Sequence, residues 1–267
     1  MCGTCIEPPL HPEGGEKIIK DFGMYPSEFR VDEFNQFTKD ITINNEGDTT
    51  EGIFAPWFLL KDEYFELIGG HDGIYAPYGY EDSDIFSRMA LADFTFIQSR
   101  DALVYHFTQR GHKWTKGVGI ENTGYREQME KTRKIYIRKF GTEPIFDYNH
   151  KPLPIPKYNI GLVLYNADNH LLEFLEPYFT NVYINNNLPY QYENKVKNIN
   201  EELSNDIIVE VDTAKLTNEN IEFLMKVPFV LKQNTQTGSF QFDIFNIYFC
   251  YFFVLFIIRY FITYSLK

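Results

Sequence analysis

The sequence predicts a mixed α/β protein, and two observations lead to this class. Apolar runs typical of buried strands alternate with segments of helical periodicity over residues 157–243. A second alternation, with glycine-rich turns between its elements, runs over residues 52–141. Hydrophobic residues make up 44% of the 267 residues and charged residues 23%, so the chain can bury a core.

Within the N-terminal part, an extended segment and two helices are expected from residue 52 onward. Residues 52–60 indicate a buried strand, and Asp62 is expected to cap a short helix that a glycine pair ends. A glycine-rich loop over residues 69–84 then leads into a helix over residues 84–92. The inward-facing side chains of that helix are expected to be Ile85, Phe86 and Met89.

A strand is expected over residues 101–107, where an apolar run is ended by polar residues. The clearest helix follows over residues 123–141, with Gly141 as its C-terminal cap. The C-terminal part alternates strands and helices, which are expected at 159–166 (strand), 170–179 (helix), 181–185 (strand), 206–212 (strand) and 218–226 (helix).

These elements suggest a division of the chain into four segments. A first domain is expected over residues 1–142, a proline-marked linker over 143–156, a small α/β domain over 157–243 and an apolar tail over 244–267. The first domain holds every residue for which the sequence suggests a catalytic role.

Charge limits the classes of partner. The net charge is −12, whereas a general nucleic-acid binder needs a basic surface, so nucleic acid is not expected as a partner. A nucleotide diphosphate would need a bridging metal ion or a local basic loop. The acidic composition is compatible with the metal ion.

Three cysteines are too few for a disulfide framework. Cys2 and Cys5 form a Cys-x-x-Cys motif, but the prolines that follow do not suit a redox helix, and a zinc site would need two further ligands. We therefore interpret both as reduced thiols without a role.

The apolar segment over residues 244–266 leaves three interpretations open: a membrane anchor, buried strands, or an aberrant end of the reading frame. No secretory signal opens the chain and no Asn-x-Ser/Thr acceptor occurs. A cytoplasmic location, or a membrane-associated one facing the cytoplasm through this tail, is therefore expected.

Two adjacent carboxylates, Glu81 and Asp82, lie where the helix after the glycine-rich loop begins. A helix N-terminus stabilises negative charge, so a carboxylate there stays ionised and can take the proton of an attacking hydroxyl. A structural alternative stays open, in which Glu81, Asp82 and Asp84 only cap the helix. His106 ends the next strand, where an imidazole can bind a metal ion or serve the fold.

These motifs occur in the order seen in family 2 glycosyltransferases of the GT-A fold, and residues 3–110 resemble the second half of that catalytic domain. The pattern is a Gly-Gly-x-Asp turn, an aromatic-Gly-aromatic-Glu-Asp motif, an arginine on the following helix and a terminal histidine. Its residues here are Gly69, Gly70, Asp72, Tyr78, Gly79, Tyr80, Glu81, Asp82, Arg88 and His106. His71 stands where the family usually has an aromatic residue.

The resemblance implies transfer of a sugar from a nucleotide-sugar donor to a hydroxyl of a glycan or another acceptor. Asp82 would be the base, while Glu81, Gly79 and Tyr80 would contact substrate. His106 would help to hold Mn²⁺ or Mg²⁺ at the donor diphosphate.

Trp57 could stack on the acceptor sugar, with a core position as the alternative. His112 and Lys113 could belong to a loop that closes over the phosphates.

The family's nucleotide-binding βαβ unit and its Asp-x-Asp motif are expected to be missing ahead of Cys2. The chain would then be a GT-A-like partial domain with a small α/β accessory domain, and it could be inactive as a fragment. Residues 162–175 and 206–224 loosely echo the missing strand and motif, with Glu210 and Asp212 as the acidic pair. The alternatives are a non-catalytic carbohydrate-binding or assembly module and a membrane-tethered interaction protein.

Overall fold

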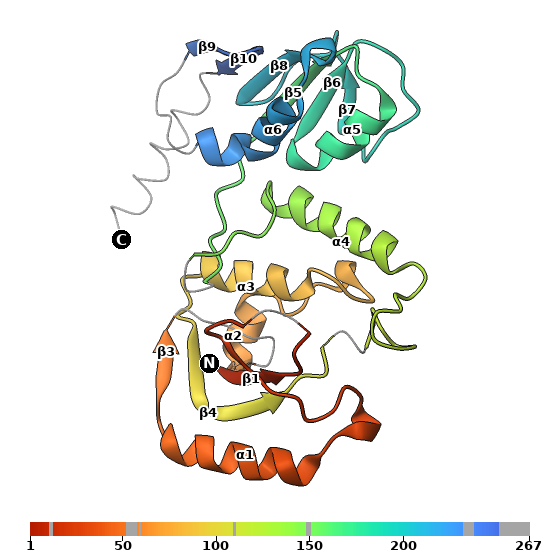
Figure 1. Ribbon diagram of the computed structural model, residues 1–267. Coiled ribbons are helices and arrows are strands. Elements are labelled where there is room, and N and C mark those ends of the chain that lie inside the picture. The colour runs from red at the N-terminus through yellow and green to blue at the C-terminus, as the bar shows by residue number, and fades with distance from the viewer. Residues whose placement is uncertain are drawn as a thin grey trace, which may run out of the picture. The chain divides into compact units, whose positions relative to one another are not determined.

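The computed structural model describes residues 1–10, 13–51, 58, 60–108, 111–147, 151–231 and 238–250. The protein is mixed α/β, as predicted, with one mixed sheet in each of two compact units (Figure 1). Unit 1 comprises residues 1–133 and 144–154, and unit 2 comprises residues 134–143 and the chain from residue 155 onward. The division falls inside helix α4 (Tyr125–Phe140) rather than in the proline-marked segment that follows it.

Unit 1 is built on a four-stranded sheet in the order β2-β1-β4-β3. Strand β1 pairs in parallel with both β2 and β4, and β3 is antiparallel to β4. Gly3 allows β1 to approach β4 closely, because a Cβ there would lie 2.8 Å from the carbonyl oxygen of Ala102. The strands are β1 (Cys2–Glu7), β2 (Lys17–Ile19), β3 (Thr49–Glu51) and β4 (Ile97–Tyr105).

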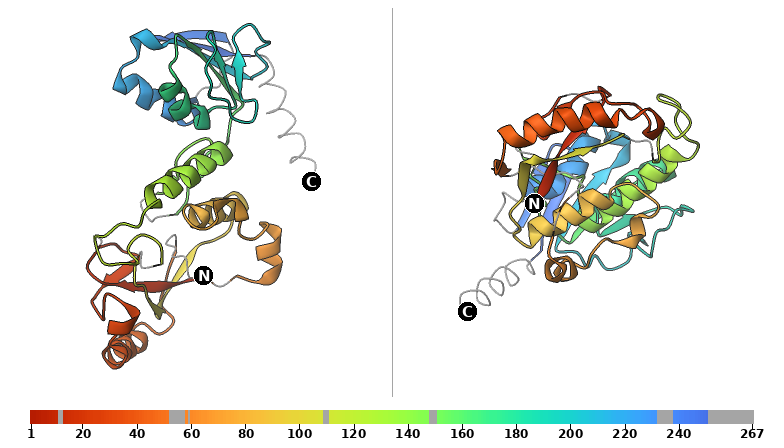
Figure 2. Two further views of the ribbon diagram at one scale, coloured as in Figure 1. Left: turned by 90° about the vertical axis from the view of Figure 1, so that its right-hand side faces the viewer. Right: turned by 90° about the horizontal axis from the view of Figure 1, so that it is seen from below.

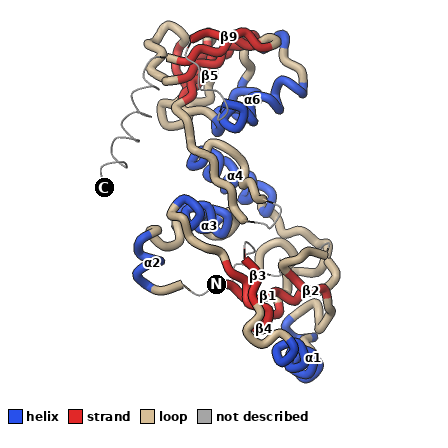
Figure 3. Tube along the Cα trace, turned by 90° about the vertical axis from the view of Figure 1, so that its left-hand side faces the viewer, coloured by secondary structure: helices blue, strands red, loops and turns tan. Residues whose placement is uncertain are grey.

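Helices α1 (Val31–Asn44) and α3 (Glu81–Leu91) lie on opposite sides of this sheet, as Figures 1 and 3 show. Helix α1 was not expected from the sequence. Its side of the sheet holds an aromatic cluster in which rings from Phe22, Phe29 and Phe34 pack within 6 Å of the Tyr105 ring. The Tyr105 hydroxyl donates to the Gly23 carbonyl at 2.8 Å, so the segment before α1 is fastened to β4.

Two predictions about the helices of unit 1 need correction. Helix α2 (Asp62–Leu67) is present, but its N-cap is Lys61, whose side chain makes no capping hydrogen bond. Helix α3 begins at Glu81 and not at Asp84, so both candidate catalytic carboxylates lie within its first turn. The predicted inward-facing residues Ile85, Phe86 and Met89 are buried, which confirms the periodicity.

Unit 2 contains a six-stranded sheet in the order β7-β6-β5-β8-β10-β9. The first four strands in that order are parallel, and β10 is antiparallel to both β8 and β9. The predicted strands near 160, 181 and 206 are confirmed, while β7 and β9 were not predicted. The strands are β5 (Ile160–Tyr165), β6 (Asn181–Ile184), β7 (Val196–Asn198), β8 (Ile207–Asp212), β9 (Gly238–Phe242) and β10 (Phe245–Phe249).

Helices α5 (Asn169–Leu175) and α6 (Asn218–Leu231) cover one face of this sheet (Figure 2). They bury a continuous apolar core that includes Leu172 and Leu224 against alternate residues of β5 and β8. Ile137, on the part of α4 that belongs to unit 2, packs into the same core. Gly141 ends α4 with a φ of 83°, which confirms the predicted cap.

The segment predicted as an apolar tail begins inside this sheet. Phe245, Ile247 and Phe249 of β10 are buried on alternate positions, as in a strand with one face on the core. The buried-strand interpretation is thus confirmed for residues 245–249, and residues 251–267 lie outside the described part of the chain. None of the helices in the described ranges combines the length and the apolar composition that crossing a bilayer requires.

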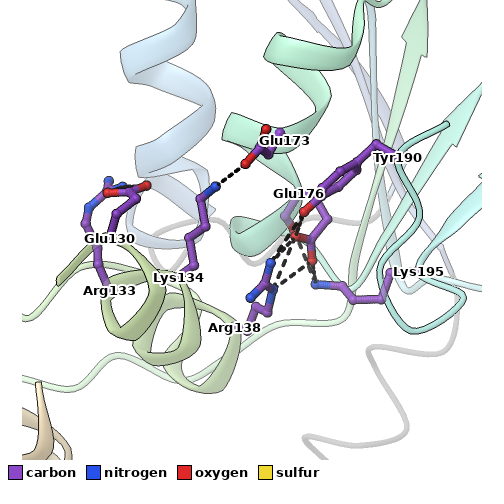
Figure 4. A network of polar contacts seen from close by, with 8 residues as sticks. All are labelled: Glu130, Arg133, Lys134, Arg138, Glu173, Glu176, Tyr190 and Lys195. Carbon is purple, nitrogen blue, oxygen red and sulfur yellow. Dashed lines mark hydrogen bonds and ion pairs between the residues drawn. The ribbon is translucent and has the colours of Figure 1, made fainter. Parts of the chain in front are cut away.

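A buried carboxylate fixes the C-terminal half of α4 within unit 2 (Figure 4). Glu176 is fully buried, and its oxygens lie 2.7 Å from both Arg138 of α4 and Lys195. The Tyr190 hydroxyl donates to the same carboxylate at 3.1 Å. A buried charge is tolerated only when its hydrogen bonds are satisfied, and here they are. Lys134 adds a more exposed ion pair to Glu173 at 2.8 Å.

Replacing Glu176 by Gln should lower the free energy of unfolding by about 3–5 kcal/mol, because Arg138 and Lys195 would stay buried with a neutral partner. Urea denaturation followed by circular dichroism measures this. The matched control is Glu173→Gln, whose half-exposed ion pair should contribute only about 0–1 kcal/mol. Equal losses in the two variants would contradict this account of the network.

Candidate functional site

The parallel pairing of β1 and β4 brings three metal-ligating side chains together at one end of the unit 1 sheet. Cys5 and Glu7 point to the same face of β1, and the ladder continues past β4 because the His106 amide donates to Ile6 at 2.9 Å. Nδ1 of His106 lies 2.7 Å from Oε1 of Glu7, and the Cys5 thiol lies 3.5 Å from that oxygen. The three ligand atoms all lie within 4.8 Å of one another.

His106 was predicted as a metal ligand, but Cys5 and Glu7 were not. The interpretation of Cys5 as a thiol without a role overlooked Glu7 on the same strand and His106, which is 99 residues from Glu7 in sequence. Alternation along β1 could have linked Cys5 to Glu7 had this segment been recognised as a strand.

Glu7 is a strongly stabilised carboxylate. Burial by itself would raise its pKa, but the hydrogen bond from His106 and the charge of Lys17 outweigh burial and lower the pKa to about 2. Lys17 lies 3.3 Å from Oε2, so it neutralises the oxygen that faces away from His106. Burial and the neighbouring Glu7 charge raise the pKa of the Cys5 thiol, which is therefore protonated.

The predicted catalytic pair occupies the first turn of α3, and the two carboxylates have different surroundings. Oδ1 of Asp82 accepts a hydrogen bond from the Ser83 amide at 2.6 Å. Oε2 of Glu81 is shielded from solvent and has no hydrogen-bond partner within the described residues. Such an oxygen is costly to leave unsatisfied, so a hydroxyl that reached Oε2 would gain a hydrogen bond there.

Asp84 is a structural residue, in contrast to its two neighbours. It is fully buried, lies 2.7 Å from the Arg88 guanidinium and accepts from the Tyr75 hydroxyl at 3.2 Å. Arg88 also donates to the Ile68 carbonyl, which ties the end of α2 to α3. Asp84 thus serves the fold through its contacts with Arg88 and Tyr75.

The charges of His106 and of the carboxylate pair Glu81 and Asp82 both influence His112. Burial lowers its pKa, the charges of His106 and Lys113 act in the same direction, and those of Glu81 and Asp82 oppose them. Glu81 and Asp82 are distant from His112 in sequence, and their charges thus act on its imidazole together with that of His106.

An aromatic group forms part of the same region. The ring centroids of Tyr78 and Tyr125 lie 5.0 Å and 5.7 Å from that of His112. The two tyrosine rings are stacked on each other at 6.1 Å. Half-buried aromatic side chains beside carboxylates are suited to binding the apolar face of a sugar or a base. Sequence reasoning did not select Tyr78 or Tyr125 as site residues.

Gly79 and Tyr80, predicted to bind substrate, shape the backbone before α3. Gly79 has a φ of 99°, and a Cβ there would lie 2.7 Å from Oγ1 of Thr132 on α4. Tyr80 is the N-cap of α3 in the left-handed region, with a φ of 65°. A non-glycine residue in that region carries strain, which is common next to functional groups. Trp57, the predicted acceptor platform, lies outside the described residues.

The cluster of Cys5, Glu7 and His106 is poorly suited to Mn²⁺ or Mg²⁺. These ions favour oxygen ligands, whereas this cluster offers one carboxylate, one imidazole and one thiol. A thiol and an imidazole suit a softer ion such as Zn²⁺.

Unit 2 has a polar edge of its own, at the carboxyl ends of its parallel strands. Asn166 lies just after β5, and its side-chain amide donates to the carboxylate of Asp212, at the end of β8, at 3.2 Å. The backbone amide of Asn166 donates to the side-chain oxygen of Asn185 at 3.0 Å. A cavity at the same ends of β6 and β7 is lined by several polar side chains, among them Asn186, Asn187, Gln191, Lys197, Asn198 and Glu201. Glu210, suggested as the partner of Asp212, instead accepts from the Tyr248 hydroxyl on β10 at 3.2 Å.

Comparison of the chain with models of protein families, with curated proteins and with solved structures gave no match.

The lowered pKa of Glu7 predicts a pH-dependent contribution to stability. The folded carboxylate has a pKa near 2 against an ordinary value of 4.5, so its contribution is complete above pH 4.5 and is lost as the pH falls toward 2. Glu7→Gln should cost on the order of 2–3 kcal/mol near neutral pH and much less near pH 2. Urea unfolding over this range, in a chelating buffer, measures the difference.

The control is Glu13→Gln, since Glu13 is exposed. Its pH profile should follow that of the wild type. A cost of Glu7→Gln that does not change with pH would disprove the ion-pair explanation.

Proposed function

We propose that unit 1 is the acceptor-side catalytic half of a GT-A-type glycosyltransferase that moves a sugar from a nucleotide-sugar donor to a hydroxyl acceptor. The observation that carries the proposal is the position of Glu81 and Asp82 in the first turn of α3, shortly after Tyr78, whose ring packs against His112. The sequence resemblance had selected Glu81, Asp82 and His106 for one site.

In this proposal Asp82 is the general base. Its carboxylate takes the proton of the acceptor hydroxyl while the hydroxyl oxygen forms a bond to the anomeric carbon of the donor sugar. The bond from that carbon to the diphosphate oxygen breaks, and its electron pair leaves with the nucleoside diphosphate. Asp82 lies in the first turn of α3, which begins directly after the turn formed by Gly79 and Tyr80.

Glu81 and the aromatic group would position the acceptor. The unpaired Oε2 of Glu81 can accept a hydrogen bond from a second hydroxyl of the acceptor. Tyr78, His112 and Tyr125 offer ring surfaces on which a sugar can stack. Positioning of this kind raises the rate because it holds the attacking oxygen close to the base.

Asp82→Asn should reduce the rate of sugar transfer by about 10²–10⁴-fold without changing the urea midpoint, because the amide cannot accept the proton. The full chain is assayed with a panel of UDP- and GDP-sugars and hydroxyl acceptors, and products are detected by mass spectrometry. Asp62→Asn is the matched control, since Asp62 occupies the first turn of α2, and it should keep full activity.

Two results would count against the proposal. Undiminished transfer by Asp82→Asn would remove Asp82 as the base. Neither transfer nor donor hydrolysis with any sugar, together with binding of the wild type to a glycan array, would favour the non-catalytic carbohydrate-binding alternative.

A specific observation favours a second function, nucleotide binding by unit 2. Its parallel strands follow the order β7-β6-β5-β8, in which the chain moves outward from β5 to β7 and then returns to the other side of β5. Open α/β sheets bind ligands at such a reversal, outside the carboxyl ends of the strands. Asp212 and the amide-lined cavity lie at those ends.

Calorimetry with UDP and GDP in the presence of Mg²⁺ or Mn²⁺ tests this second function on the full chain. Asp212→Asn should weaken nucleotide binding at least tenfold, because it removes the carboxylate at the carboxyl edge. Asp206→Asn is the control, since Asp206 precedes β8 at the opposite edge of the sheet. Photo-crosslinking of the nucleotide to peptides of unit 1 alone would contradict the assignment to unit 2.

A further inference from the structure

The cluster formed by Cys5, Glu7 and His106 has the composition and placement of a built metal site. Cys5 and Glu7 are almost fully buried, with 5% and 7% of their surface exposed, while about a third of the His106 side chain is exposed. Two donors thus come from the interior of the sheet, and the third lies at its surface.

The backbone fixes the three donors relative to one another. Cys5 and Glu7 are separated by one residue on β1, and the intervening Ile6 points to the other face and is fully buried. Ile6 pairs with Tyr105, and the next amide, that of His106, donates to the Ile6 carbonyl. Donors held by strand pairing need little reorganisation on binding an ion.

Lys17 leaves one oxygen of Glu7 available. Its ammonium lies 3.3 Å from Oε2, while Oε1 is the oxygen next to both His106 and Cys5. A second partner that orients a ligating carboxylate is common around bound metals. The lysine also offsets part of the negative charge that a carboxylate and a thiolate would place in a buried site.

We propose that Cys5, Glu7 and His106 bind a thiophilic divalent ion of the Zn²⁺ type, and that the site does not select Mn²⁺ or Mg²⁺. On binding, Cys5 releases its thiol proton to solvent and the thiolate bonds to the ion. Nδ1 of His106 releases the proton that it shares with Glu7 to solvent, and the ring carries its one remaining proton on Nε2, so that a neutral imidazole and the Glu7 carboxylate both face the ion. Three protein ligands with an open fourth position are a recurrent zinc arrangement.

A plain ion-pair cluster is the competing explanation. In that case Glu7 would serve only as the ion-pair partner of His106 and Lys17, and Cys5 would act as a buried apolar side chain. The two explanations differ in the role that they assign to the sulfur atom, so the test examines the sulfur directly.

Co²⁺ is the probe, because cobalt bound to a thiolate gives a charge-transfer absorption that oxygen and nitrogen ligands do not give. The full chain is stripped with a chelator under reducing conditions and titrated with Co²⁺. We expect one equivalent of Co²⁺ to produce the band, Zn²⁺ to displace it, and a large excess of Mg²⁺ to leave it unchanged. Competition with a chromophoric chelator then gives the Zn²⁺ affinity.

Cys5→Ser should abolish the band and weaken Zn²⁺ binding by on the order of 10²-fold or more. The matched control is Cys2→Ser, because Cys2 is a buried cysteine on the same strand that is not part of the cluster. This variant should keep the cobalt absorption band and the Zn²⁺ affinity of the wild type. His106→Gln is a second test at a partly exposed position where loss of folding is less of a concern, and it should also weaken Zn²⁺ binding.

No band in the folded wild type, or a band that survives Cys5→Ser, would overturn the zinc site and favour the ion-pair cluster. This inference is independent of the proposed transfer reaction. A chain that binds Zn²⁺ but transfers no sugar would reject the glycosyltransferase alone, and transfer without the cobalt band would reject the zinc site alone.

Discussion

The parallel ladder between β1 and β4 is the constraint on which unit 1 depends. It joins the first residues of the chain to residues about a hundred positions later, and its last hydrogen bond places His106 beside Glu7. The Glu7–His106 contact exists only because that register is kept. A shift by one residue would turn Cys5 and Glu7 to the opposite face and separate all three donors.

The sequence was a good guide to elements with a clear period. Helix α4, strands β5 and β8 and the buried face of α3 follow directly from the spacing of apolar residues. It was a poor guide to β1, whose residues Cys-Gly-Thr-Cys have no strong strand preference and are held by long-range pairing. Phe245–Phe249 could be taken for part of a membrane span because four of its five residues are apolar or aromatic, which hides the alternation of buried and exposed positions.

The candidate site was predictable only where chemistry was concentrated in short motifs. The adjacent Glu81 and Asp82 could be selected from their place before a helix, and His106 from its place after a strand. Cys5 and Glu7 could not, because their importance arises from proximity to His106 across the sheet. Tyr125 is a similar case, since only the fold brings the start of α4 to Tyr78 and His112.

The boundary between the units inside α4 has a consequence for how such a chain can evolve. Residues 134–143 belong with unit 2, whereas residues 144–154, which come later, belong with unit 1. No single breakpoint in the gene separates the two units cleanly, and a break after residue 142 would leave Arg138 on one product and Glu176 on the other. Exchange of either unit through a single breakpoint would therefore also move residues of the other unit.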